Sequence, residues 1–260
     1  MSVRLAKLIL VFWLTIIFSP YTLGEKFVYA VSDFPPWTIW SDDLVGSGGV
    51  KGIDVDIVNA LAEKLGLTVE VVRCPWIRCL TLLENGEADI TGSLLRRSER
   101  EEYLHYFMPP YLAPSYCVFY VRKGERDSIR DYEDLYGGMR VGVSRGARYF
   151  PRFDQDSRIN REVVTSNDQL LPMLALNRIH TFVVEEDVGD YLIANNGYSG
   201  KFEKASYRYS FSRYGYFALS KKSLYIERAD EFRVILKEMI DAGLVDELRK
   251  KYIQPVEMSN

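Results

Sequence analysis

Histidine and cysteine are scarce in this chain, and their scarcity argues against several kinds of site. His105 and His180 are the only histidines, and they lie far apart in the sequence. The chain therefore offers few residues for a metal centre or a catalytic Ser-His pair. The three cysteines do not follow a zinc-ligand spacing. We therefore expect no metal ligand, no cofactor and no catalytic residue.

Basic residues do not outnumber acidic residues in this chain. The net charge of the 260 residues is −3, which gives no support to a nucleic acid as partner. The apolar fraction of 47% is ordinary for a globular protein, so the chain can bury a sizeable core. The length allows one or two domains.

Long hydrophobic runs are missing except at the N-terminus. Residues 8–18 form an apolar run after Arg4 and Lys7, and Pro20, Thr22 and Gly24 follow it. The run is shorter than the ~20 residues that a spanning helix needs. This pattern predicts a secretory signal peptide at 1–24, with a membrane anchor as the alternative. A cleaved signal would place the mature protein in the periplasm.

Two cysteines lie close together in the exported part of the chain. Cys74 and Cys79 flank a Pro-Trp-Ile-Arg segment at the junction of an expected strand and helix. An oxidising compartment permits a disulfide between them, although two buried thiols remain the alternative. We favour the bridge, and we expect Cys117, in an apolar run, to be a buried thiol.

The first half of the mature chain alternates between strands and helices. Apolar periodicity and the glycines that follow both helices predict five elements. They are a strand at 27–31, a helix from Asp54 or Asp56 to Leu65, a strand at 67–72, a helix at 77–85 and a strand at 88–92. This order implies an α/β fold with parallel strands.

The second half repeats this plan and then adds three elements. The repeat consists of a strand at 140–143, a helix near Tyr149, a strand at 162–164, a helix at 168–176, a strand at 180–184 and a helix at 188–194. A strand at 216–220, a long helix starting near Ile226 and a helix at 245–252 follow. Two similar lobes predict a hinged clamp, with crossings near 117–122 and 214–219.

The ends of the strands are the candidate ligand site. Ligands of open α/β sheets bind beyond the carboxyl ends of the strands, and in a clamp those ends face each other. The candidate segments are 33–37, 74–78, 92–100, 144–148 and 185–187.

Seven segments, in this order, resemble the family 3 extracellular solute-binding proteins, which serve ABC importers for polar amino acids. They are SDFPPW (32–37), KGIDVDIVNALAEKLG (51–66), GEADITG (86–92), SEREEYLHYFMPPY (98–111), RVGVSRGA (140–147), NRIHTFVVEE (177–186) and MIDAGLVDELRKKY (239–252). The resemblance covers nearly all of the mature chain.

The resemblance implies a two-lobe periplasmic-binding-protein fold of type II. Each lobe would be a mixed, mainly parallel sheet flanked by helices, with the ligand held between the lobes. We expect one lobe at 25–118 plus 217–260 and the other at 119–216.

The resemblance also assigns the two charged anchors. Arg100 matches the arginine that holds the ligand α-carboxylate, a group that a guanidinium grips through two parallel hydrogen bonds. The alternative is a surface arginine paired with Glu99 or Glu101. Glu185 matches the acid that binds the ligand ammonium, with a solvated surface acid as the alternative.

Aromatic and backbone groups complete the expected site. Phe34 and Trp76 match aromatic residues that contact the ligand, whereas Trp37 and Trp40 fit packing within their loop. The remaining ligand-binding residues are backbone donors and members of the second-lobe loop. They are Gly92, Ser93, Leu94, Ala147 and Arg148.

Two departures from the family pattern concern the ligand. LeuLeuArgArg at 94–97 and Gly146-Ala147 replace segments that usually carry a Ser or Thr hydroxyl for the carboxylate. Arginines at these places could substitute, and the start of the following helix favours an anion. The sequence therefore suggests a ligand with more negative charge, a non-standard amino acid or a small peptide. The arginines concerned are Arg96, Arg97, Arg145 and Arg148.

The function expected from these observations is capture of an amino-acid-like solute and its delivery to an ABC permease in the inner membrane. We expect a monomer that is not an enzyme. One alternative is a periplasmic enzyme of the cyclohexadienyl dehydratase type on the same fold, for which no second catalytic group is evident. Another is a ligand-sensing partner of a membrane receptor.

Overall fold

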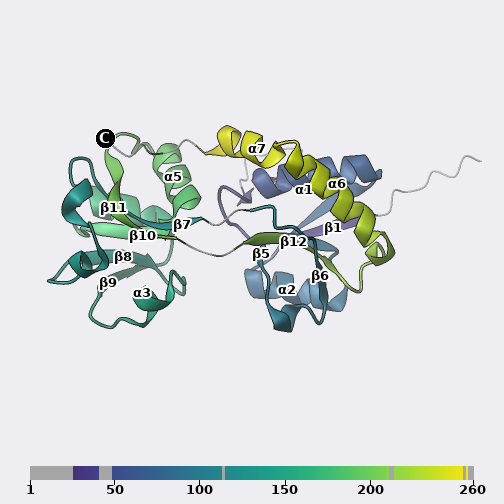
Figure 1. Cartoon of the computed structure of the whole chain (residues 1–260), viewed down its shortest axis with the longest axis horizontal. Helices are drawn as coiled ribbons and strands as arrows, with labels where there is room; N and C mark the ends of the chain where they lie inside the picture. Colours follow the sequence, from purple (N-terminus) through teal and green to yellow (C-terminus); the bar gives the residue numbers. More distant parts are fainter. Residues whose placement is uncertain (1–25, 41–48, 113–114, 211–213, 254–255, 257–260) are drawn as a thin grey trace, which may run out of the picture.

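The computed structural model describes residues 26–40, 49–112, 115–210, 214–253 and 256. The expected signal peptide at 1–24 lies outside the described residues. Two five-stranded sheets, with helices on both faces of each, form two lobes (Figure 1). A small hairpin of β2 (Ile39–Trp40) and β3 (Val50–Lys51) adds to the first lobe. None of the described helices has the length and hydropathy needed to cross a bilayer.

The first sheet has the strand order β4-β1-β5-β12-β6. Its strands are β1 (Lys26–Val31), β4 (Thr68–Arg73), β5 (Ile90–Leu95), β6 (Leu104–Tyr106) and β12 (Gly215–Ser220). β1 is parallel to β4 and β5, whereas β12 is antiparallel to β5 and β6. One face packs on α1 (Ile53–Leu65), α6 (Ala229–Asp241) and α7 (Leu244–Tyr252), and the other on α2 (Trp76–Asn85).

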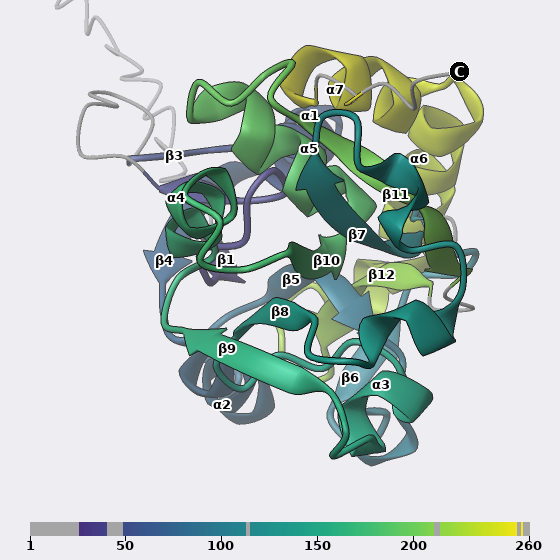
Figure 2. The same ribbon diagram turned by 90° about the vertical axis from the view of Figure 1, so that its left-hand side faces the viewer.

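The second sheet has the strand order β11-β7-β10-β8-β9. Its strands are β7 (Tyr116–Arg122), β8 (Arg140–Ser144), β9 (Asn160–Val164), β10 (Thr181–Glu185) and β11 (Phe202–Ser210). The helix α3 (Pro151–Gln155) covers one face, and α4 (Leu170–Ala175) and α5 (Glu186–Asn195) cover the other (Figure 2). β8 is parallel to β9 and β10, and β7 is antiparallel to both of its neighbours.

The expected helices of the first lobe are confirmed. Apolar residues every three or four positions bury one face of α1, and Gly66 and Gly86 end α1 and α2 in the left-handed conformation with φ of 69° and 81°. A glycine adopts that conformation without the steric cost that a side chain imposes. The strand expected at 88–92 is shifted, since β5 runs from Ile90 to Leu95 and takes in three residues, 93–95, that the sequence placed in a loop.

The positions expected for the two crossings are strands instead. Residues 117–122 lie in β7, inside the second sheet, and residues 215–219 lie in β12, inside the first. The chain passes between the sheets between Leu112 and Tyr116 and again between Ser210 and Gly215. The lobe boundaries expected after 118 and after 216 therefore fall within these two strands.

Candidate functional site

A cleft of about 810 Å³ lies between the two lobes. Residues from the ends of β1 and β5, the start of α2, the start of α5 and the helix α7 line it. Six of the residues predicted for the site are among them: Phe34, Trp76, Gly92, Ser93, Arg100 and Glu185. The strand ends of both lobes thus contribute to one site, as expected for an open α/β sheet.

Three predicted residues lie outside the lining of this cleft. The Leu94 side chain is fully buried in the core beside α2, because β5 continues past it and turns it away from the cleft. Leu95, the next residue of the strand, lines the cleft in its place. Ala147 and Arg148 are exposed in the loop after β8, away from the lining residues.

Arg100 is held by its neighbours but by no acid. Its guanidinium lies 5.7 Å from the centre of the Trp76 ring, and one Nη donates to the Leu95 carbonyl oxygen at 3.3 Å. Among the described residues it has no ion-pair partner, because Glu99 lies beside Arg97 and Glu101 pairs with Arg96. The remaining N–H groups of Arg100 are suited to a bidentate contact with a carboxylate.

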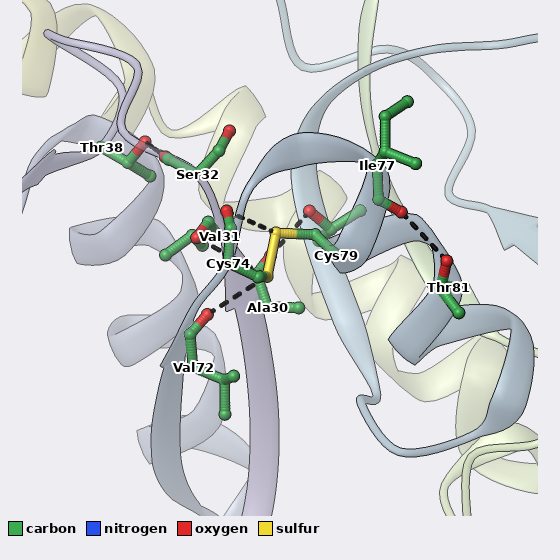
Figure 3. Close-up of a disulfide and its surroundings, with 10 residues drawn as sticks. Ala30, Val31, Ser32, Thr38, Val72, Cys74, Ile77, Cys79 and Thr81 are labelled. Atoms are coloured by element: carbon green, nitrogen blue, oxygen red, sulfur yellow. Dashed lines mark hydrogen bonds between the residues drawn. A yellow bond between two sulfur atoms is a disulfide. The ribbon is translucent and has the colours of Figure 1, made fainter.

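The disulfide between Cys74 and Cys79 is present, as predicted (Figure 3). Trp76 lies between the two cysteines in the chain. Cys74 follows the end of β4 and Cys79 lies in the first turns of α2, both of them buried. The bridge therefore ties the start of α2 to the sheet, and Trp76 with it. Cys117 is fully buried in the core of the second lobe.

The loop after β1 presents Phe34 and buries Trp37. The Phe34 N–H donates to the Thr38 carbonyl oxygen at 2.9 Å, and its own carbonyl accepts from the Trp37 N–H at 2.9 Å, which closes a tight turn. Phe34 is 36% exposed at the cleft, whereas Trp37 is 5% exposed in the core. Trp37 therefore packs the loop, and it is also one of the residues that line the cleft.

Glu185 occupies the N-cap position of α5 without a capping hydrogen bond to its side chain, and the acids that follow it are each paired with a cation. Lys204 Nζ lies 2.8 Å from Glu186 Oε1 and 2.7 Å from Asp190 Oδ2, and Arg249 Nη2 lies 2.6 Å from Asp187 Oδ1. Burial raises the pKa of Asp187 and of Asp190, and their cations oppose this shift. Glu185 is the acid of this group that the family correspondence selects for an ammonium.

The sequence missed a buried acid at the floor of the cleft. Asp54 is 1% exposed in the first turn of α1, and burial raises its pKa to about 7, against the opposing effect of hydrogen bonds from Tyr111 and Ser93. Tyr29, Tyr111 and Asp54 all line the cleft. An acid in the first turn of a helix is common because of the helix dipole, so no local signal marked Asp54 as special.

The charges of the cleft count against an extra anionic group on the ligand. Its lining contains more acids than arginines: Asp33, Asp54, Glu185, Glu186, Asp187 and Asp246 against Arg97, Arg100 and Arg249. Arg96 pairs with Glu101, and neither it nor Arg145 or Arg148 reaches the lining. The described residues include no cluster of three or more His, Cys, Asp or Glu side chains that could hold a metal ion.

Two α/β lobes with a charged and aromatic cleft between them form the architecture of a solute-binding protein that closes on its ligand. Residues 28–255 match the model of the bacterial extracellular solute-binding proteins, family 3, and the chain belongs to that family. Membership in a family of extracellular binding proteins agrees with the expectation of a binder rather than an enzyme.

The chain is similar to several characterised or named relatives. It is 33% identical over 122 residues to a probable histidine-binding protein of Neisseria gonorrhoeae, covering 46% of this chain and 43% of the relative. It is 21% identical over 239 residues to the arginine-binding extracellular protein ArtP of Bacillus subtilis, covering 88% and 86%. The chain therefore spans less than half of the first relative and most of the second.

Solved structures share the fold. The amino acid ABC transporter substrate-binding protein AbpA of Streptococcus pneumoniae, bound to L-arginine, superposes with a TM-score of 0.67 at 20% identity, covering 87% of this chain and 94% of that one. An ancestral cationic amino acid solute-binding protein gives 0.69 at 22% identity, with coverages of 88% and 95%. These likenesses confirm the type II two-lobe fold.

Proposed function

We propose that this protein captures an amino acid between its lobes in the periplasm and delivers it to an ABC permease. The observation that carries the proposal is that Arg100 of the first lobe and Glu185 of the second line one cleft. Opposite charges on the two lobes match the carboxylate and the ammonium of a zwitterion. Names of relatives in the same family, which mention histidine, cystine and arginine, support this class of ligand.

The side chain of the ligand is proposed to be neutral or cationic. Asp187 pairs with Arg249, and Glu186 pairs with Lys204. With these pairs set aside, the acids of the lining still outnumber its arginines, as Asp33, Asp54, Glu185 and Asp246 against Arg97 and Arg100, which disfavours a second anionic group and attracts a positive one. Phe34 and Trp76 supply aromatic faces, on which a cation gains roughly 0.5–2 kcal/mol. This reading replaces the more anionic ligand that the LeuLeuArgArg segment suggested.

Ligand binding would shift the equilibrium between the open and closed forms of the protein towards the closed form. A ligand that contacts Arg100 and Glu185 together binds the closed form better than the open one, and this difference shifts the population towards closure. The permease would then recognise the closed form.

Isothermal titration with a panel of the twenty amino acids tests the proposal. We expect Arg100→Ala to lose about 2–5 kcal/mol of binding free energy, at least a ~30-fold rise in Kd. Arg100→Lys keeps the positive charge but loses the planar pair of N–H donors that binds a carboxylate. It should therefore bind more tightly than Arg100→Ala but more weakly than wild type. Arg96→Ala is the matched control, since Arg96 pairs with Glu101 outside the cleft. Equal Kd values for Arg100→Ala and wild type would show that another group holds the carboxylate.

Ligand sensing is a second candidate. The chain is 25% identical over 175 residues to the virulence sensor protein BvgS of Bordetella pertussis, covering 66% of this chain and 13% of that protein. Uptake of the bound amino acid by cells with and without this protein separates the two roles, because loss of uptake on deletion supports transport.

A further inference from the structure

The buried carboxyl of Asp54 accepts hydrogen bonds from two segments of the first lobe. The Tyr111 hydroxyl donates to Oδ1 at 2.6 Å, and the Ser93 hydroxyl donates to Oδ2 at 2.7 Å. Ser93 lies at the cleft, and Tyr111 lies just before the first crossing to the second lobe. The carboxyl therefore joins the floor of the cleft to the hinge.

Ser93 depends on these contacts for its conformation. Its φ is 50°, a left-handed value that is uncommon for a residue with a side chain. Its N–H donates to the Tyr111 hydroxyl oxygen at 2.8 Å, and its side chain is bound by Asp54. The preceding Gly92 packs on the same carboxyl, since a Cβ there would meet Asp54 Oδ2 at 2.6 Å. We call Gly92 and Ser93 the shelf.

Tyr111 connects the shelf to both crossings. Its ring stacks on Phe217 of β12, with ring centres 4.3 Å apart. Its N–H donates to the Gly215 carbonyl oxygen at 3.1 Å, and the Leu112 N–H donates to the same oxygen at 3.3 Å. The start of the first crossing and the start of β12, where the second crossing ends, are thus hydrogen-bonded to each other beside Tyr111.

The hydrogen-bond pattern around Asp54 depends on its proton. An ionised Asp54 accepts the hydroxyl protons of both Tyr111 and Ser93 in charge-assisted bonds. A neutral Asp54 can donate its own proton to the Tyr111 oxygen, and Tyr111 then turns its hydroxyl towards Ser93 Oγ, which is 3.3 Å away. Protonation of Asp54 therefore replaces the short charge-assisted bond from the Tyr111 hydroxyl to Asp54 with a longer neutral bond from that hydroxyl to Ser93 Oγ.

Two tyrosines, Tyr29 and Tyr111, lie near Asp54. Among the described side chains, no cation affects the pKa of Asp54. Tyr29 on β1 has a buried hydroxyl with no hydrogen-bond partner among the described residues, and the charge of Asp54 adds to burial in raising the pKa of Tyr29 and of Tyr111. β12 contributes the Phe217 ring, and the loop before α1 contributes the Trp37 carbonyl, which accepts from the Asp54 N–H. Within the described parts of the chain, no positive side chain favours the ionised form of Asp54.

We propose that Asp54 is a positioning residue that ties the shelf to the hinge, so that its ionisation sets the affinity of the cleft for an amino acid. This proposal rests on the proposed function. The ionised form accepts one charge-assisted bond from the Ser93 hydroxyl and one from Tyr111, whose oxygen in turn accepts from the Ser93 N–H. It also adds a negative charge that favours the ligand ammonium. Affinity should therefore increase as the pH rises across the titration of Asp54, which lies near neutrality because of burial.

A ligand-free measurement tests the coupling itself. We would follow the Asp54 carboxyl by 13C NMR between about pH 5 and pH 9, with Asp54→Asn to assign the signal. The Ser93 amide shift should titrate with the same midpoint in wild type. Tyr111→Phe removes the hydroxyl that joins them, and it should reduce the response of Ser93. A Ser93 amide that stays flat while Asp54 titrates overturns the proposal.

A binding measurement tests the consequence, with L-arginine and L-glutamine as probes. Wild type should bind several-fold more tightly at about pH 8 than at about pH 6, and Asp54→Asn should bind at both pH values with the weaker affinity. Asp56→Asn, on the same helix but paired with Lys251 at 2.7 Å, is the matched control and should keep the wild-type slope. An unchanged slope in Asp54→Asn overturns the proposal. If neither probe binds at any pH, the proposed ligand class fails, and the NMR result still decides the coupling.

Discussion

The Arg249 guanidinium of α7 lies 2.6 Å from the Asp187 carboxylate of α5 and thereby joins the two lobes outside the crossings. In Figure 1 the helix α7 lies between α1 of the first lobe and α5 of the second. Ile253, just after α7, is buried in the core of the first lobe, and Val256 packs against the core of the second. The end of the chain is therefore a third link between the lobes, beside the cleft.

Arg249→Ala should destabilise the protein by about 1–3 kcal/mol, because it leaves the buried Asp187 carboxylate without its cation. Asp187→Asn in the same background should recover part of this loss, since it removes the buried charge. Urea unfolding of the two single variants and the double variant measures the coupling. Lys251→Ala, which breaks a more exposed pair within the first lobe, is the control and should cost much less. Additive effects of Arg249 and Asp187 would contradict the link.

Replacing both cysteines of the disulfide with serine should cost about 2 kcal/mol, because a short closed loop restrains the unfolded chain only modestly. The same variant should also weaken amino-acid binding, since it loosens the start of α2 that carries Trp76. Urea unfolding and titration with the bound amino acid measure the two effects. A double Cys→Ser variant with unchanged affinity would show that packing alone holds Trp76.

Lys204→Met should be among the most damaging single changes in the second lobe. It leaves Asp190 and Glu186 without their shared cation, and breaking a buried ion pair in this way costs about 3–5 kcal/mol. Lys204→Met with Asp190→Asn should be more stable than Lys204→Met alone, because one uncompensated charge is gone. Thermal unfolding at neutral pH compares the two, and equal melting temperatures would argue against a charge effect.

The stability of the protein should fall with rising pH through the titration of Asp54. Its folded pKa of about 7 lies above the ordinary aspartate value of 3.8, so the stabilising contribution of the neutral acid is complete below about pH 4 and is lost as the pH rises through about 7. Relative to Asp54→Asn, wild type should therefore lose stability between pH 5 and pH 8. Melting temperatures of both proteins across this range give the difference, and a constant difference would contradict the raised pKa.

Local signals explain which parts of the fold the sequence could predict. Apolar periodicity and the left-handed glycines Gly66 and Gly86 mark the last residues of α1 and α2. The start of α2 was predicted to within one residue, whereas α1 begins at Ile53, one residue before the first of the two predicted starts, Asp54 and Asp56. The crossings were misplaced because β7 and β12 read as extended apolar segments, and nothing local shows which sheet they join. β7 pairs with β11, and β12 pairs with β5, across long stretches of chain.

At the candidate site, too, some residues were predictable from the sequence and others were not. Arg100 and Trp76 were predicted from the family pattern, and the structure places both in the lining of the cleft. Leu94, expected to offer a backbone group, is not among the lining residues, and its side chain lies on the opposite face of the sheet from the cleft. The link from Arg249 to Asp187 joins residues far apart in the chain, so no spacing could reveal it.

The position of β12 in the first sheet has a consequence for the order in which the chain can fold. β12 is the last strand to be synthesised, yet it lies between β5 and β6 in the interior of its sheet. The strands of the second sheet, by contrast, all come from residues 116–210. When the chain emerges from its N-terminus, the second lobe can assemble before the first has its full set of strands. Until then the edge of β5 remains unpaired, and chains that end before Gly215 should be prone to associate through that edge.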